Sequence, residues 1–294
     1  MTGARGALHS GMRVEEFFDL RIAVLEPGED PPPDAHLARI EEPAARDVER
    51  LVGENWFYKP RGVTYVLETP ASLEAYIERA FRAGSRGAPR RLLREVPRRF
   101  RFEVGEAGSG VEAFLELYRR TIAARPLGLD RIAQRGHRFG PGWRGLYLFD
   151  GRRLAAGVMV RRLRDRLSAA YGAFDPTDSA HDLEHFLLMQ ALRLCIEERI
   201  PRLSLGRDTN LYGHHLPLGL PAYKLRLGFR PLPYEPAGRE LLKVLDLAPF
   251  RGGLFFYAFG PNGLEGSLFG AESLDPRPFA HRGAPPVRAR RIPS

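Results

Sequence analysis

Residues 201–231, PRLSLGRDTNLYGHHLPLGLPAYKLRLGFRP, contain the most informative pattern of the sequence. A short apolar run at 203–205 ends at Gly206, and a polar loop follows it. Regular structure begins again near Ala222 and turns at Gly228. The pattern predicts a strand, a polar loop, a short helix, a glycine turn and a second strand. A buried strand that delivers polar side chains into a loop is a common way to build a functional site.

Lysine is rare in this chain. Among the 45 Lys and Arg residues, the lysines are Lys59, Lys224 and Lys243. Where only charge matters, such a chain uses arginine, so a retained lysine indicates a need for a compact, flexible ammonium. We therefore expect Lys224 to point into a cleft and to contribute little to folding. A solvated surface lysine is the alternative interpretation.

Composition limits the class of protein. A chain of 294 residues with 44% hydrophobic content can bury a sizeable core. It has no apolar run near the ~20 residues that a membrane span needs, and its first residues lack the apolar centre of a secretory signal. We therefore expect a cytoplasmic protein. The single cysteine, Cys195, excludes an internal disulfide framework and a cysteine-rich zinc site, and its apolar surroundings indicate a buried, inert thiol.

The charge balance favours an anionic partner. The formal net charge is +9 and the isoelectric point is near 10. Residues 86–101 hold seven arginines and one glutamate, and the segment after Asp275 holds five arginines and no acid. That last segment is also rich in Pro, Gly and Ala, which predicts a disordered tail. A solvated basic face is the alternative for both segments.

The hydrophobic period changes from two to about 3.6 along the chain, which predicts both strands and helices. The resulting fold class is α/β (α+β), with a mixed, mainly antiparallel sheet flanked by helices. A long helix over 182–199 is apolar around most of its girth and should be buried. Helices are expected at 73–81, 111–122 and 182–199, and strands at 63–67, 100–104, 145–149, 154–162 and 167–174.

Three domains are expected. Residues 1–70 form an abbreviated N-terminal lobe whose first 11 residues are disordered. Residues 71–240 form the main domain, and 241–294 form a C-terminal extension with the basic tail. No internal repeat of solenoid length is visible.

Three stretches of the main domain form a recognisable series: SLEAYIERAFRAGSRGAPRRLLR (72–94), LYLFDGRRLAAGVMVRRLRDRLSAAYGAFDP (146–176) and SLGRDTNLYGHHLPLGLPAYKLRLGF (204–229). In this order they resemble the GCN5-related N-acetyltransferase (GNAT) superfamily, and within it the Fem-type and CelD-like N-acyltransferase branch. The likeness covers about residues 70–235. It implies a GNAT-like enzyme that moves an acyl or aminoacyl group from an activated donor to an amine.

The sequence departs from an ordinary acetyltransferase where the buried helix begins. Such enzymes cradle the coenzyme A pyrophosphate on a glycine-rich loop at the helix N-terminus. Here the junction reads DPTDSAHDLEH (175–185), with three aspartates and no glycine. The resemblance therefore implies no tightly bound cofactor but a co-substrate donor, which could be aminoacyl-tRNA, an acyl carrier or acyl-CoA. The partners implied are this anionic donor, with tRNA a candidate, and an amine-bearing small molecule, peptide or cell-wall precursor.

Acyl transfer to an amine needs an oxyanion stabiliser and a proton acceptor. Lys224 and the backbone near Tyr171 are candidates for the first role. Glu184 and His185, at the start of the buried helix, are candidates for the second, with Asp208 as another choice. The substrate-binding candidates are Tyr171, Gly172, Arg207, Asn210, Tyr212 and Tyr223.

Plainer interpretations stay open for these residues. Glu184 could only favour the helix N-terminus, and His185 could be a surface histidine. Arg207 and Asp208 could be an ion pair that fixes the loop. His214 and its neighbour lack a third ligand, so a metal site is rejected. The alternatives at the level of function are a nucleic-acid-binding module that uses the arginines of 86–101, and a GNAT-like scaffold without activity.

Overall fold

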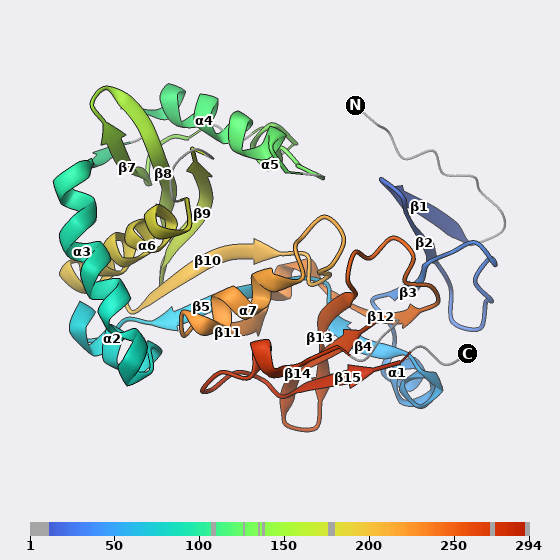
Figure 1. The fold of residues 1–294 in the computed structure, drawn as a ribbon. Helices are drawn as coiled ribbons and strands as arrows, with labels where there is room; N and C mark the ends of the chain where they lie inside the picture. Colours follow the sequence, from blue (N-terminus) through green and yellow to red (C-terminus); the bar gives the residue numbers. More distant parts are fainter. Residues whose placement is uncertain are drawn as a thin grey trace. The chain divides into compact units, whose positions relative to one another are not determined.

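The structure is a computed structural model that describes residues 12–106, 110–125, 127–134, 136, 139–175, 180–270 and 274–291. Residues 1–11, for which the sequence predicts disorder, lie outside these ranges. The chain divides into two compact units, which can be followed by sequence colour in Figure 1. Unit 1 comprises Met1–Thr64, Arg207–Leu225 and Arg230–Ser294, and unit 2 comprises Tyr65–Gly206 and Arg226–Phe229.

Unit 2 is built on a sheet with the strand order β5-β10-β9-β8-β7-β6. The pairs β6–β7, β7–β8 and β8–β9 are antiparallel, whereas β9 and β10 are parallel. The predicted mixed, mainly antiparallel sheet is therefore confirmed. Its strands are β5 (Val63–Glu68), which begins in unit 1, β6 (Arg101–Glu106), β7 (Trp143–Asp150), β8 (Arg153–Arg162), β9 (Leu167–Phe174) and β10 (Arg202–Asp208), which ends in unit 1.

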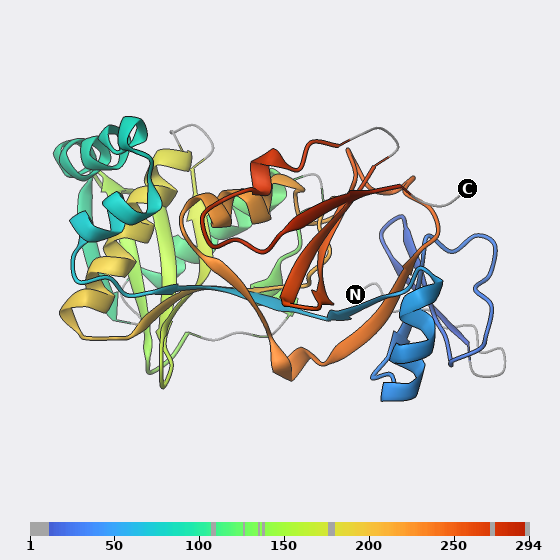
Figure 2. The same ribbon diagram turned by 90° about the horizontal axis from the view of Figure 1, so that it is seen from below.

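Helices flank this sheet, as the sequence pattern predicts. The long helix α6 (Ala180–Glu197) packs against β7, β8 and β9, and Figure 2 shows it lying along them. Leu187, Met189 and Ala191 of this helix are fully buried, so the expected buried helix is confirmed. The remaining helical elements are α2 (Leu73–Ala80), η2 (Ala83–Ser85), α3 (Gly87–Arg99), α4 (Val111–Ala123) and α5 (Arg131–Gln134).

Helix α2 begins where the sequence indicates a helix start. The Ser72 side chain accepts a hydrogen bond of 3.1 Å from the Ala75 backbone N–H, which satisfies one of the free donors of the first turn. Helix α4 packs on β8 and β9, and its Phe114 and Tyr118 share a core cluster with Tyr147 and Met159 of the sheet. Alternation along β7 therefore places Tyr147 on the α4 face.

Unit 1 contains two sheets. One has the strand order β1-β2-β3-β12-β4, and the other β13-β14-β15. The elements are β1 (Arg13–Phe17), β2 (Leu20–Val24), β3 (Leu37–Glu41), α1 (Ala45–Leu51), η1 (Val52–Glu54), β4 (Phe57–Pro60), α7 (Gly219–Arg226), β11 (Arg230–Pro233), η3 (Glu235–Ala237), β12 (Arg239–Val244), β13 (Leu254–Gly260), β14 (Gly263–Phe269), η4 (Arg277–Phe279) and β15 (Val287–Arg290).

The C-terminal residues differ from the expectation of a separate extension with a disordered tail. Strand β12 lies between β3 and β4, so residues from both ends of the chain build one sheet. Strand β15 pairs in parallel with β14, from Val287 to Arg290. Phe279 is buried and stacks on Phe255 with 4.5 Å between the ring centroids. One aromatic anchor and a ladder of backbone hydrogen bonds therefore order a segment whose composition indicates disorder.

Within the described residues, no helix is both long and apolar enough to cross a membrane.

Candidate functional site

The predicted site residues fall into two groups. Arg207, Asp208, Asn210, Tyr212, Tyr223 and Lys224 belong to unit 1, and Tyr171, Gly172, Glu184 and His185 belong to unit 2.

The unit 1 group is centred on a buried ion pair. Lys224 on α7 donates to Oδ2 of Asp208, at the end of β10, over 2.6 Å from its Nζ. The Tyr212 hydroxyl donates to the same oxygen over 2.9 Å. The side chains of Lys224 and Asp208 are only 8% and 10% exposed. A charge-assisted hydrogen bond of this length in a dry environment is strong, and it holds α7 against the strand end.

This pairing changes the expectation for Lys224. From the sequence, the Lys224 ammonium is expected in a cleft, where its loss would barely affect folding. In the structure Lys224 is buried and its charge is balanced by Asp208. Removing one partner of a buried pair leaves an uncompensated charge, which is typically destabilising by about 3–5 kcal/mol. Lys224 is therefore part of the framework of unit 1, whatever else it does.

Asn210 has a structural explanation that the sequence did not reveal. It is fully buried, and its Nδ2 donates to the carbonyl oxygens of Pro60 (2.7 Å) and Tyr257 (2.8 Å). Its Oδ1 accepts from the Tyr257 backbone N–H over 2.8 Å. The left-handed φ of +53° at Asn210 suits asparagine better than most residues. This side chain pins the loop after β10 between β4 and β13.

The other unit 1 candidates differ in exposure. Arg207 is exposed, and its guanidinium carbon lies 5.1 Å from the ring centroid of Tyr234. Tyr212 is fully buried and forms an antiparallel bridge with Phe255. Tyr223 is half-buried on α7, next to Lys224 in the sequence. The loop of residues 209–218 is thus held by Tyr212 and Asn210, while Arg207 and Tyr223 retain some exposure.

In unit 2, Tyr171 and Gly172 lie beside a β-bulge. The β8–β9 register shifts between Met159, which pairs with Tyr171, and Val160, which pairs with Ala169. Ala170 is therefore the extra residue in β9. A bulge bends the strand and re-aims nearby groups, which is why bulges are frequent next to active sites.

The adjacent strand is also irregular at this point. The parallel ladder between β9 and β10 includes Leu203–Leu167 and Ser204–Ser168. Two residues further on, Gly206 has a φ of +70°. A Cβ built at Gly206 would lie 3.5 Å from the Ala169 carbonyl oxygen, an ordinary contact, so the backbone conformation rather than lack of space requires glycine. Irregular backbone in β9 and β10 thus coincides at one level of the sheet.

Glu184 and His185 lie in the second turn of α6 and have different environments. Glu184 is half-buried. His185 is 9% exposed and packs against Phe81, with 5.5 Å between ring centroids, and its Nε2 has no hydrogen-bond partner among the described residues. Burial lowers the pKa of His185 to about 4, and the nearby His181 adds to the shift. The imidazole is therefore neutral at physiological pH but only weakly basic.

Comparison with known protein families places all ten of these residues in one domain. Residues 79–224 match the family model described as an acetyltransferase (GNAT) domain. The chain contains a GNAT domain. The predicted superfamily is therefore confirmed, and the GNAT domain takes in most of unit 2 and continues through the β10–α7 loop to Lys224.

Several solved structures are also similar to this chain. FemX is 11% identical, with a TM-score of 0.47 over 80% of this chain and 84% of that one. L-PGS from Bacillus licheniformis is 8% identical, with a TM-score of 0.43 over 79% and 80%. A tandem GNAT protein from the clavulanic acid biosynthesis pathway is 12% identical, with a TM-score of 0.38 over 79% and 77%. No curated protein matches the sequence.

Histidine, carboxylate and cysteine side chains could support a metal site or a nucleophilic thiol. Across the described ranges, no three His, Cys, Asp or Glu side chains lie close enough together to hold a metal ion. His214 instead pairs its Nε2 with Asp19 Oδ1 over 2.6 Å. Burial raises the pKa of the Cys195 thiol to about 12, which makes it a poor nucleophile.

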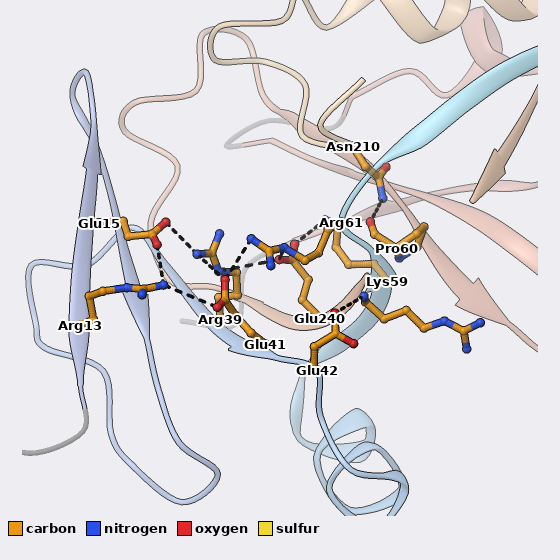
Figure 3. A network of polar contacts seen from close by, with 11 residues as sticks. Arg13, Glu15, Arg39, Glu41, Glu42, Lys59, Pro60, Arg61, Asn210 and Glu240 are labelled. Atoms are coloured by element: carbon orange, nitrogen blue, oxygen red, sulfur yellow. Dashed lines mark hydrogen bonds and ion pairs between the residues drawn. The ribbon is translucent and has the colours of Figure 1, made fainter. Parts of the chain in front are cut away.

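Unit 1 contains a second buried lysine that the sequence analysis does not single out. Lys59 on β4 is 1% exposed, and its Nζ donates to Glu240 Oε1 on β12 over 2.6 Å. Figure 3 shows this pair beside Arg39, Arg61 and an outer group of acidic and basic side chains. The scarcity of lysine in the sequence, applied to Lys59 as well as Lys224, would have identified it. Both residues lie in niches that suit a compact ammonium.

Proposed function

We propose that the protein is an N-acyltransferase or aminoacyltransferase, which moves an acyl group from an activated donor to an amine. The observation that carries the proposal is the GNAT match over residues 79–224, because it includes every candidate catalytic and substrate-binding residue. The β-bulge in β9 and the polar start of α6 add local features that this chemistry can use.

The amine must lose a proton as it attacks the donor carbonyl. Glu184 is our candidate for the base, since a half-buried carboxylate can accept a proton directly or through one water molecule. His185 is less suited, because a base with a pKa of about 4 gives little driving force for proton transfer. We therefore assign His185 to packing against Phe81.

The tetrahedral intermediate carries a negative oxygen that needs hydrogen-bond donors. We assign this role to backbone N–H groups near Tyr171 and Gly172, because the adjacent bulge interrupts the regular ladder of β9. Lys224 is a weaker candidate than its sequence position indicated, since Asp208 already compensates its charge. In this proposal Lys224 and Asp208 are positioning residues that fix the loop between β10 and α7.

The donor is an activated ester or thioester and an anionic co-substrate, with aminoacyl-tRNA, an acyl carrier and acyl-CoA as candidates. We expect acetyl-CoA to bind weakly, because the start of α6 is acidic and has no glycine. Of that junction, 176–179 lie outside the described residues. Asp175 is buried and forms an ion pair with Arg153, so its carboxylate is held in place next to the junction.

A donor panel tests this proposal. The full-length protein is incubated with acetyl-CoA, with charged tRNA and with an acylated carrier protein, each with a mixture of primary amines, and amide formation is followed by mass spectrometry. Glu184→Gln should lower turnover about 10²–10⁴-fold with an unchanged thermal midpoint, the range for loss of a general base. Glu197→Gln is the matched control, since Glu197 is an exposed carboxylate on the same helix. Equal turnover of the two variants would remove Glu184 from the mechanism, and micromolar affinity for acetyl-CoA would overturn our view of the donor.

A further inference from the structure

Helix α3 has two faces of opposite character. Pro89, Leu92 and Val96 are buried and recur at helical spacing, so they form the stripe that packs against the rest of unit 2. At 100° per residue, Arg91, Arg94 and Arg98 lie within about 60° of one another on the face opposite this stripe. All three are exposed. Over seven residues of helix they span about 10 Å along its axis.

Other arginines of the same segment already have structural roles. Arg86 donates to the carbonyl oxygens of Phe81 (3.2 Å) and Glu78 (2.9 Å), which satisfies groups at the end of α2. Arg90 pairs with Glu74 at the start of α2. Arg99 lies over the Phe100 ring, with 4.7 Å from its guanidinium carbon to the ring centroid. Arg101 pairs with Glu103 and lies over the Phe149 ring, with 4.9 Å from its guanidinium carbon to the ring centroid. These contacts account for four of the seven arginines at 86–101, and Arg91, Arg94 and Arg98 are the remainder.

The outer face is only weakly neutralised. Arg91 approaches Glu95 at 3.6 Å, but both side chains are more than half exposed, so this pair contributes little. Arg94 and Arg98 have no ion-pair partner within the described parts of the chain. Three guanidinium groups on one side of a rigid helix form a regular row of donors that suits phosphate oxygens.

We infer that this row, Arg91, Arg94 and Arg98, binds the phosphate backbone of a nucleic-acid duplex without reading its sequence. A single strand is less suitable because its binding depends on exposed aromatic side chains for base stacking. The large apolar residues that are exposed in the described ranges are Phe18, Val52, Val104 and Leu232, and none of them is on α3. The absence of such anchors on this helix also disfavours insertion into a membrane surface. The inference rests on α3 alone and holds whichever acyl donor is used.

The test is a salt titration of binding, measured by fluorescence anisotropy with labelled RNA and DNA duplexes of about 16 base pairs. Three phosphate contacts predict a slope of log K against log salt of about −2.7, which is roughly a 40-fold loss of affinity between 50 and 200 mM salt. The variant R91Q/R94Q/R98Q should lose this slope, by about one for each arginine. Its thermal midpoint should be unchanged, because the buried stripe of α3 is intact.

The control variant is R119Q/R152Q/R164Q. It removes the same net charge from exposed positions on α4 and on the β7–β8 and β8–β9 turns, and it should bind duplexes like the unmodified protein. If both variants weaken binding equally, only net charge matters and the inference is wrong. Binding of the unmodified protein to vesicles of phosphatidylcholine and phosphatidylserine but not to duplexes would also overturn it. The inference is supported if binding to RNA duplexes, DNA duplexes or both requires the three arginines.

Discussion

Unit 1 contains two buried lysine–carboxylate pairs of the same length in different settings. Lys59–Glu240 joins neighbouring strands β4 and β12, lies outside residues 79–224, and is accompanied by Arg39 and Arg61. Lys224–Asp208 joins α7 to the end of β10, inside the GNAT match, and shares its carboxylate with Tyr212. Identical chemistry thus serves a regular sheet in one place and a loop-bearing segment in the other. We expect the setting of a buried pair, rather than its strength, to decide whether its loss affects activity.

The largest expected effect is at Glu240. Glu240→Gln leaves the ammonium of Lys59 buried near the guanidinium groups of Arg39 and Arg61, and burial already lowers the pKa of Lys59. We expect a loss of about 3–5 kcal/mol in the free energy of unfolding of unit 1. Lys59→Met should cost less, because Arg39 and Arg61 still face the Glu240 carboxylate.

Tryptophan fluorescence can measure this in unit 1 alone. The chain has two tryptophans, Trp56 in unit 1 and Trp143 in unit 2, so urea unfolding in a Trp143→Phe background follows Trp56. The double variant Lys59→Met/Glu240→Gln is the control and should recover most of the lost stability. If Glu240→Gln proves milder than Lys59→Met, Arg39 and Arg61 do not compensate the Glu240 carboxylate once Lys59 is gone.

The second prediction separates stability from activity at Lys224. Lys224→Met leaves the Asp208 carboxylate with the Tyr212 hydroxyl, and we expect a loss of about 3 kcal/mol, at the lower end for a broken buried pair. Lys224→Met/Asp208→Asn removes both charges and should restore most of the stability, because the side-chain amide introduced at position 208 can still accept from the Tyr212 hydroxyl. Turnover should nevertheless stay reduced about tenfold or more, since the loop of residues 209–218 loses the ionic contact that fixes it.

Whether the two buried pairs differ in function depends on turnover in the two double variants. Turnover with the donor found in the panel is measured for both double variants at a temperature where each is folded. Lys59→Met/Glu240→Gln should keep full turnover. Full turnover in Lys224→Met/Asp208→Asn as well would mean that both pairs are purely structural and that the position of Lys224 inside the GNAT match has no functional meaning.

The sequence predicts the local structure of unit 2 well and the organisation of unit 1 poorly. Strands β7 to β9 and helix α6 follow from apolar periodicity, which depends on neighbouring residues. The placement of β12 between β3 and β4 depends on pairing residues about 200 positions apart, which no local pattern records. The same limitation explains β15, whose basic, proline-rich sequence indicates disorder but whose partner is β14.

The site was predicted in part for the same reason. The scarcity of lysine draws attention to Lys224, but the sequence does not indicate that Asp208, 16 residues earlier, is its partner. The polar loop predicts a ligand-binding role for Asn210, yet its side-chain amide donates to the backbone carbonyls of Pro60 and Tyr257. A polar loop residue can point outward to a ligand or inward to the chain, and composition does not distinguish the two.

The smallest expected effect concerns the third lysine. It tests whether every lysine position in this chain requires an ammonium rather than a guanidinium. Lys243 on β12 is half-buried, with its Nζ 5.8 Å from the ring centroid of Trp56. A cation–π contact at such a position is worth about 0.5–1 kcal/mol, so Lys243→Ala should lower the free energy of unfolding by that amount. Lys243→Arg should be nearly neutral, because a guanidinium also stacks well on an indole. Lys224→Arg should instead be clearly destabilising, since a planar guanidinium does not fit a buried niche shaped for an ammonium. Both arginine variants are made in the Trp143→Phe background, and their urea unfolding is followed by the fluorescence of Trp56. The contrast between the two lysines rests on the burial of the Lys224–Asp208 pair. If Lys224→Arg and Lys243→Arg lower the free energy of unfolding by similar amounts, this burial does not decide where arginine is tolerated.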